Sequence, residues 1–342
     1  MSIDRRLRLA LFGSGRIGQV HARNVAAHPD LELALIADPF IDGARRLAAA
    51  TGARAVESAD EVFAEPGLDG VIIGSPTSTH VGLIEQAVRH GIAALCEKPI
   101  DLDLDTALAC RERISGTSVP IMLGFNRRFD PAFASVQARV AAGEVGRLEQ
   151  LTIISRDPAP APRDYIAGSG GIFRDMTIHD LDMARFFVPD ITEVTAVGTN
   201  VFSSDIEELG DYDSAVVTLR GRGGEIVTIT NSRHCAFGYD QRLEAFGADG
   251  ALAAGNVTPT TVRKYGAAGT EAAEAYQPFF LERYAQAYQS ELAAFATSIR
   301  TGAPCSPSFD DGVAALILAN AATESAATGR SVAVQPVTAG RD

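Results

Sequence analysis

Short apolar runs alternate with stretches of helical spacing through the first third of the chain. The apolar runs are nearly continuous, which is typical of strands buried on both faces of a parallel sheet. They cover residues 7–12, 31–37, 70–73, 93–96 and 120–124, and helical spacing covers residues 17–27, 41–50, 79–89 and 104–114. Because strands and helices alternate with short connections, the pattern predicts a doubly wound parallel sheet with right-handed crossovers.

The pattern changes after Phe125. Longer strand candidates, several of which alternate apolar with polar positions, lie at residues 148–155, 194–200, 214–220 and 225–232. A hairpin turn is expected at Gly221-Arg-Gly-Gly224, and helices are expected at 282–300 and 311–328. We therefore predict an α/β protein with a doubly wound domain at residues 1–123. Residues 124–342 should form an α/β domain with a large, mostly antiparallel open sheet, and its last helix should pack back on the first domain.

A glycine motif, Gly13-Ser-Gly15-Arg-Ile-Gly18, directly follows the first predicted strand and opens a helix. In such a motif the glycines permit a tight turn, a close approach of pyrophosphate, and close packing of helix on strand. Asp38 ends the second predicted strand, 20 residues beyond Gly18, where a carboxylate accepts a hydrogen bond from a ribose 2′-OH and repels a 2′-phosphate. This spacing predicts a Rossmann domain that binds NAD rather than NADP. The alternative is a glycine turn with a helix-capping aspartate.

Further cofactor contacts are expected from the same loop and from the next strand ends. Arg16 and Ile17 lie inside the glycine motif. Ser75, Thr77 and His80 follow the fourth predicted strand at the carboxyl edge of the sheet, where nucleotides lie. Alternatively, Thr77 or its neighbour Ser78 caps the following helix.

Glu97-Lys98-Pro99 comes straight after the fifth predicted strand, again at the carboxyl edge. Glu97 and Lys98 are therefore candidates for contact with the cofactor, and the Lys98-Pro99 bond could be cis. A lysine amine beside the reacting carbon could also stabilise developing negative charge. The alternative is an exposed surface lysine without a chemical role.

Asp175 and His179 are spaced i, i+4, so on a helix both side chains share one face. An imidazole held by a carboxylate is a poised general base. Asp180 and Asp182 follow, and they could instead make this segment a solvated acidic face. Together with Lys98 and the nucleotide motif, the pair predicts a dehydrogenase that moves a proton while a hydride leaves carbon.

Composition and charge narrow the class of protein. The 342 residues are 46% hydrophobic and 21% charged, as in an ordinary globular protein. A formal net charge of −13 argues against nucleic acid or an acidic membrane as partner. Neither an apolar run of about 18 residues nor a signal-peptide core is found, so the cytoplasm is the expected compartment. No metal site or disulfide framework is expected from the spacing of Cys96, Cys110, Cys235 and Cys305.

These motifs resemble the Gfo/Idh/MocA oxidoreductase family over nearly the whole chain. The resemblance rests on the glycine motif, Glu97-Lys98-Pro99, Gly124-Phe-Asn-Arg-Arg-Phe-Asp130 and Gly170-Gly-Ile-Phe-Arg-Asp-Met-Thr-Ile-His179. It implies a Rossmann domain, a second α/β domain with a large open sheet, and a homotetramer built on those sheets. It also implies that Lys98, Asp175 and His179 form the catalytic set.

Within the family, Ser155-Arg-Asp-Pro158, residues 175–182 and Gly238-Tyr-Asp-Gln241 are most similar to inositol 2-dehydrogenases. This likeness implies NAD-dependent oxidation of a ring hydroxyl of myo-inositol, or of a close cyclic polyol, to the ketone. The implied substrate contacts are Lys98, Arg127 or Arg128, Asp157, Asp175, His179 and Tyr239. Some inositol dehydrogenases carry a histidine where this chain has Ser155 to Asp157, which leaves the isomer open.

Three alternatives remain at this point. The proton acceptor could be His179 or Lys98. The substrate could be another sugar, namely an aldose, a uronate or a keto-sugar. Finally, the chain could be a ligand-sensing protein that keeps the nucleotide fold and has lost catalysis.

Overall fold

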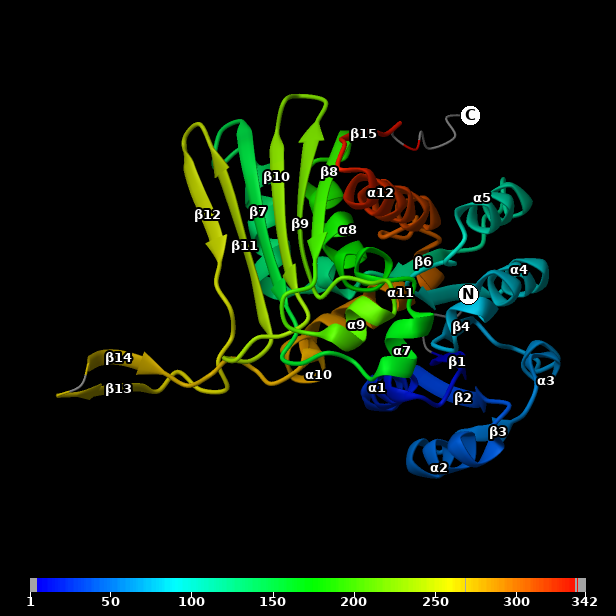
Figure 1. The fold of residues 1–342 in the computed structure, drawn as a ribbon. Helices are drawn as coiled ribbons and strands as arrows, with labels where there is room; N and C mark the ends of the chain where they lie inside the picture. Colours follow the sequence, from blue (N-terminus) through cyan, green and yellow to red (C-terminus); the bar gives the residue numbers. More distant parts are fainter. Residues whose placement is uncertain (1–4, 268, 336, 338–342) are drawn as a thin grey trace. The chain divides into compact units, whose positions relative to one another are not determined.

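The computed structural model describes residues 5–267, 269–335 and 337. The chain forms two compact units, which are traced in Figure 1. Unit 1 comprises the residues up to Asn126 together with Ala287–Val313, and unit 2 comprises Arg127–Gln286 together with the residues after Val313. The sequence predicted a single change of domain after residue 123. In the structure the chain also returns to unit 1 through most of α11 (Ala285–Thr301), and the last helix, α12 (Phe309–Thr328), begins in unit 1 and continues in unit 2.

Unit 1 is built on a six-stranded parallel sheet in the order β3-β2-β1-β4-β5-β6. Its strands are β1 (Leu7–Phe12), β2 (Leu31–Ala37), β3 (Arg54–Val56), β4 (Gly70–Ile73), β5 (Ala93–Glu97) and β6 (Ile121–Gly124). Its helices before Asn126 are α1 (Arg16–Ala27), α2 (Ile41–Thr51), α3 (Ala59–Phe63), η1 (Thr77–Thr79), α4 (His80–His90) and α5 (Leu104–Arg113). The predicted doubly wound parallel sheet is confirmed. The structure also contains the short elements β3 and α3, which were not predicted.

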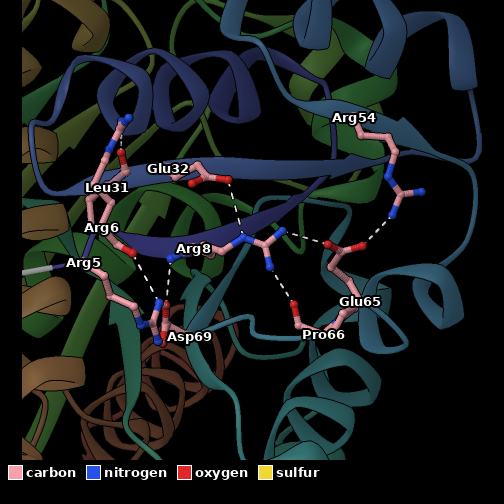
Figure 2. A network of polar contacts seen from close by, with 9 residues as sticks. All are labelled: Arg5, Arg6, Arg8, Leu31, Glu32, Arg54, Glu65, Pro66 and Asp69. Carbon is pink, nitrogen blue, oxygen red and sulfur yellow. Dashed lines mark hydrogen bonds and ion pairs between the residues drawn. The ribbon is translucent and has the colours of Figure 1, made fainter. Parts of the chain in front are cut away.

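Charged side chains gather at the amino ends of the strands of this sheet (Figure 2). Arg5 donates two hydrogen bonds to Asp69, at 2.5 and 2.7 Å. Glu65 accepts from Arg8 at 2.8 Å and from Arg54 at 2.7 Å. The acidic and basic groups pair with one another at this edge, whereas the predicted cofactor residues follow the carboxyl ends of the strands.

Unit 2 contains a seven-stranded sheet in the order β12-β11-β7-β10-β9-β8-β15, and only β7 and β10 run parallel. Its strands are β7 (Leu148–Arg156), β8 (Ile191–Thr199), β9 (Ser214–Gly221), β10 (Ile226–Ser232), β11 (Asp240–Gly247), β12 (Gly250–Ala254) and β15 (Val332–Ala333). A separate ribbon of β13 (Arg263–Gly266) and β14 (Gly269–Ala273) projects from this unit (Figure 1). The mostly antiparallel sheet confirms the predicted fold class.

The remaining helical segments belong mainly to unit 2. They are η2 (Asn126–Phe129), α6 (Pro131–Ala141), α7 (Arg163–Gly168), η3 (Phe173–Thr177), α8 (Ile178–Phe187), α9 (Ser204–Glu208) and α10 (Phe280–Arg283). Helices α6 and α8 pack on β11, β12 and β7. None of the helices in the described ranges is long and apolar enough to cross a membrane.

The two faces of the seven-stranded sheet differ in exposure. Along β9 and β10 the side chains of Val217, Leu219, Val227 and Ile229 are fully buried. The alternate positions face solvent, and this outer face carries apolar side chains that are 43–65% exposed, namely Val197, Val216, Ile226 and Phe246. The hairpin turn predicted at Gly221 to Gly224 is confirmed by a hydrogen bond from Gly224 N–H to the Gly221 carbonyl, 3.0 Å long.

Candidate functional site

The glycine motif forms a tight loop between β1 and α1 in which side chains are excluded at two positions. Gly13 has a φ of +94°, and a Cβ there would lie 2.6 Å from the Gly74 carbonyl oxygen. A Cβ on Gly18 would lie 2.1 Å from the Gly13 carbonyl oxygen. At Gly15, by contrast, a Cβ would meet no atom within 4 Å among the described residues outside its own chain segment, and both Gly15 and Arg16 are exposed. Ile17 packs inward against Gly74, so the loop is open only on the side of Gly15.

Asp38 stabilises this loop through hydrogen bonds. Its Oδ2 accepts hydrogen bonds from Ser14 N–H at 2.8 Å and from Ser14 Oγ at 2.6 Å, and its Oδ1 accepts one from Phe40 N–H at 2.8 Å. Burial alone would raise the pKa of Asp38, but these hydrogen bonds outweigh burial and lower it, so the carboxylate is ionised. Asp38 therefore holds the loop in place, but it caps neither α1 nor α2, so the alternative of a helix-capping aspartate is wrong.

The open side of the loop offers room for a dinucleotide. A hollow of about 1020 Å³ is lined at one end by Ser14, Gly15 and Asp38 and continues between α1 and α2. The backbone N–H groups at the start of α1 are suited to phosphate, and the Asp38 carboxylate is suited to a ribose hydroxyl. NAD therefore fits the residues of unit 1.

The loop after β4 is held by its own contacts. Ser75 Oγ lies 2.6 Å from Thr79 Oγ1, and Thr77 opens η1 without a side-chain cap for α4. His80 is buried, with Nδ1 2.8 Å from the Pro99 carbonyl oxygen and Nε2 2.9 Å from the Ser75 carbonyl oxygen. Burial lowers the pKa of His80. Both ring nitrogens are thus engaged by the protein, and cofactor contact through the His80 side chain remains a prediction.

Glu97 and Lys98 lie at the carboxyl end of β5, as predicted. Lys98 is partly buried, and the Lys98-Pro99 bond is cis. Glu97 Oε1 lies 2.7 Å from His21 Nε2 on α1. The cofactor and catalytic candidates of unit 1 thus share one edge of the parallel sheet.

Asp175 and His179 of unit 2 lie on a helical segment that changes type. Residues Phe173–Thr177 form a π-helix, which continues into α8 at Ile178. Such π segments occur frequently at functional sites. Asp175 accepts hydrogen bonds from Tyr165 Oη at 2.8 Å and from Arg233 Nη1 at 3.4 Å. These partners orient the Asp175 carboxylate.

The arginines after β6 separate into two buried ion pairs. Arg127 pairs with Asp180, and Arg128 donates two hydrogen bonds to Asp182, at 2.6 and 2.8 Å. Because Asp180 and Asp182 are at most 1% exposed, the alternative of a solvated acidic face is wrong. Each charge is instead neutralised inside unit 2.

Arg127, Asp157, Asp175 and Tyr239 influence one another electrostatically. Burial raises the pKa of Asp157 to about 7, with the Asp175 charge as the next cause, while Arg233 and Arg127 oppose the shift. Burial also raises the pKa of Tyr239, which Arg127 opposes. The structure thus brings these predicted substrate residues together within unit 2, and Arg127 rather than Arg128 belongs to this group.

Two residues that hold Asp175, Arg233 and Tyr165, were missed by sequence reasoning. Arg233 is 1% exposed and bridges Asp175 and Asp211, the latter at 2.9 Å. Tyr165 comes from α7, which follows Pro158, Pro160 and Pro162. An arginine directly after a predicted strand was the available signal, because the parallel neighbours β7 and β10 end side by side.

Within the described ranges, no group of three or more His, Cys, Asp or Glu could hold a metal ion.

Comparison with known proteins gives matches over both units. Residues 7–125 match an oxidoreductase family with an NAD-binding Rossmann fold, and residues 133–253 match the GFO/IDH/MocA C-terminal domain. An inositol 2-dehydrogenase of Rhizobium meliloti (strain 1021) is 44% identical over 96% of this chain and 99% of its own length. These matches confirm the predicted family resemblance and the predicted NAD-binding domain.

Solved structures give the same result. A myo-inositol dehydrogenase from Corynebacterium glutamicum ATCC 13032 has a TM-score of 0.95 and 66% identity, with 97% of this chain and 100% of that chain covered. A scyllo-inositol dehydrogenase from Lactobacillus casei with bound NAD(H) and scyllo-inositol has a TM-score of 0.88 and 26% identity. In that comparison 96% of this chain and 99% of that chain are covered.

Proposed function

The chain belongs to the Gfo/Idh/MocA oxidoreductase family, and from this membership we propose that it oxidises a ring hydroxyl of myo-inositol, or of a close cyclic polyol, to the ketone with NAD. The observation that carries the proposal is the near full-length likeness to proteins named as inositol dehydrogenases. The chain also has Lys98, Asp175 and His179 in the motifs that the family resemblance implies as catalytic.

The proposed chemistry assigns one task to each of these side chains. NAD, when bound, supplies the acceptor for the hydride that leaves the ring carbon. His179 accepts the hydroxyl proton, and Asp175, fixed by Tyr165 and Arg233, orients and stabilises the imidazole. Lys98 donates a hydrogen bond to the same oxygen and stabilises its developing negative charge. The alternative, in which Lys98 accepts the proton, uses the same residues.

Arg127, Asp157 and Tyr239 are the proposed contacts to the other ring hydroxyls. Their mutual electrostatic influence supports a common place within unit 2. An uncharged polyol suits this group better than a uronate does. Both Arg127 and Arg128 are already neutralised by Asp180 and Asp182, so neither provides a spare positive charge for a substrate carboxylate.

A substrate panel tests the proposal. NADH formation is followed by absorbance at alkaline pH with myo-inositol, scyllo-inositol and other isomers, and with aldoses and uronates. We expect at least one inositol to give a larger kcat/KM than any aldose or uronate. A preference for an aldose or a uronate would support the alternative of a dehydrogenase that acts on another sugar. No NAD reduction with any of these compounds would favour a ligand-sensing protein without catalytic activity.

For assembly we propose a homotetramer built on the seven-stranded sheet. The support is the exposed apolar outer face formed by Val197, Val216, Ile226 and Phe246, since such faces mark interfaces. Light scattering at micromolar concentration should give the mass of four chains, and a monomer would contradict this proposal.

We place the activity in the cytoplasm and in inositol catabolism, in keeping with NAD as oxidant and with four buried free cysteines.

A further inference from the structure

Helix α11 of unit 1 carries a glutamate in an apolar interior. The side chain of Glu291 is 0% exposed, and among the described residues neither of its carboxyl oxygens has a hydrogen-bond partner. An isolated buried carboxylate is very costly, because the protein interior solvates a charge far less well than water does. A buried acid of this kind therefore requires a physical explanation.

The packing of α11 places Glu291 toward the carboxyl edge of the parallel sheet. Near the far end of the helix, Ile299 Cδ1 and Phe295 Cε1 lie 3.0 and 3.3 Å from a Cβ position on Gly70, the first residue of β4. Nearer the start of the helix, Tyr288 packs edge-on against His21 of α1, with ring centroids 5.9 Å apart. Glu291 follows Tyr288 by one helical turn.

Titratable groups of β5, α1 and α11 lie near this place. Glu97 at the end of β5 and His21 on α1 form a pair, with Nε2 and Oε1 2.7 Å apart, and Tyr288 lies on α11 itself. The other Glu97 oxygen, Oε2, would lie 2.9 Å from a Cβ on Gly124, so glycine there leaves room for the carboxylate. Burial raises the pKa of Glu291 well above its usual value, and the charge of Glu97 raises it further.

Two neighbouring carboxylates with little access to water repel one another, and the more deeply buried of the two gains most by keeping its proton. We propose that Glu291 is the neutral, protonated member in the native protein, so that Glu97 alone is negative and pairs with His21. Glu97 is joined directly to Lys98, so Glu291 acts as a positioning residue for the segment that leads into Lys98. This last consequence rests on the proposed function, whereas the assignment of the proton does not.

Difference infrared spectroscopy tests the proton directly, without substrate. The comparison is made in an Asp157→Asn background, because the Asp157 carboxyl, with a pKa of about 7, would give a band of its own at neutral pH. In this background the otherwise wild-type protein at neutral pH should show the C=O stretching band of a protonated carboxylic acid. The band should be absent in Glu291→Gln, which keeps the shape of the side chain, and present in Glu97→Gln. Glu112→Gln is the matched control, because it removes an exposed carboxylate of the same unit and should leave the band unchanged. A band lost in Glu97→Gln and kept in Glu291→Gln would overturn the assignment.

The pH dependence of unfolding gives a second test. A carboxyl group whose pKa is raised in the folded state holds a proton that the unfolded chain releases, so its contribution to stability is lost as pH rises above the unfolded pKa. Relative to Glu291→Gln, the unfolding constant of wild type should increase about tenfold for each pH unit while Glu291 stays protonated, as expected for one proton. Equal pH dependence in the two proteins would contradict the inference.

The two proposals fail separately. If the infrared band and the pH dependence show an ionised Glu291 while inositol is oxidised normally, the present inference is wrong and the proposed function stands. If the proton is found on Glu291 but no polyol reduces NAD, the proposed function is wrong and the proton assignment stands.

Discussion

The nucleotide loop of unit 1 is shaped by backbone, whereas the Asp175 region of unit 2 is shaped by charged side chains. Between Gly13 and Gly18 the decisive contacts are those that a Cβ would make with backbone atoms. Around Asp175 the decisive contacts are ion pairs, in which Arg233 bridges Asp175 and Asp211. The first kind of site should fail when a side chain is added, and the second should fail when a partner is removed.

Removal of Arg233 should have the largest effect on stability. Arg233→Met keeps most of the bulk and leaves Asp175 and Asp211 without their guanidinium. Breaking a buried ion pair in this way costs about 3–5 kcal/mol, because an uncompensated charge stays in the interior. Urea unfolding measures the loss.

Arg139→Ala is the matched control for Arg233→Met. Arg139 pairs with Glu144 on the surface of the same unit, and both side chains are about half exposed. Such a pair contributes only about 0–1 kcal/mol. If the two variants unfolded at the same urea concentration, the buried ion pairs of Arg233 would not be the interactions that stabilise the region around Asp175.

Two alanine substitutions in the glycine loop should separate folding from cofactor binding. Gly18→Ala places a Cβ 2.1 Å from the Gly13 carbonyl oxygen, so it should lower both Tm and NAD binding. Gly15→Ala meets no protein atom within 4 Å among the described residues outside its own chain segment, so it should leave Tm unchanged. It should still reduce kcat/KM for NAD by about 100-fold, the scale expected when a group is displaced by about 1 Å. Normal NAD kinetics in Gly15→Ala would show that the phosphates do not approach this residue.

Asp157 should make stability depend on pH in a defined window. Its pKa is raised from 3.8 to about 7, mainly by burial and secondly by Asp175. Because the native carboxyl holds its proton more tightly than the unfolded chain does, its contribution to stability is lost as pH rises between these two values. The unfolding free energy of wild type relative to Asp157→Asn should therefore fall across this window and level off above it. A constant difference from acid to neutral pH would mean that Asp157 is ionised throughout.

The smallest effect is expected at Asp38. Asp38→Ser removes the proposed acceptor for the ribose hydroxyl and the negative charge that is expected to repel a 2′-phosphate. It should weaken NAD use and relax the exclusion of NADP, as measured by the ratio of kcat/KM values for the two cofactors. Part of the loss should come from the loop itself, because Asp38 accepts two hydrogen bonds from Ser14. Equal use of NAD and NADP by the wild type would contradict this role.

The sequence predicted unit 1 more completely than unit 2. Continuous apolar runs mark β1, β2, β4, β5 and β6, whereas β3 and α3 are too short to show a period. In unit 2 the sequence predicted β7 to β10 and missed β11 to β15. Strands β12 to β14 are mostly exposed, which weakens the alternation, and β15 has only two residues. Strand β11 begins with the buried polar residues Asp240 and Gln241, which hide its pattern.

The candidate site residues of unit 1 were likewise predicted more completely than those of unit 2. The glycine motif and Asp38 could be located from spacing, because backbone geometry dictates them. The partners of Asp175 could not be assigned to it, because Tyr165 and Arg233 are 10 and 58 residues away along the chain and no helical or strand period links them to Asp175. The π-helical turn at Phe173–Thr177 could not be predicted either, because the sequence of this segment fits an ordinary α-helix equally well.

The central proposal is that Lys98 and His179 act on the same hydroxyl group, and a double-mutant cycle tests it most directly. Lys98→Met and His179→Ala should each lower kcat for the best inositol by about 100-fold or more, the usual scale for loss of a general base or an oxyanion donor. NAD affinity should change little in either variant.

The double variant decides the question. Residues that act as one unit give losses that are less than multiplicative, so the double variant should be little slower than the slower single variant. Full turnover in either single variant, or losses that multiply in the double variant, would contradict the claim that the two residues share one catalytic step.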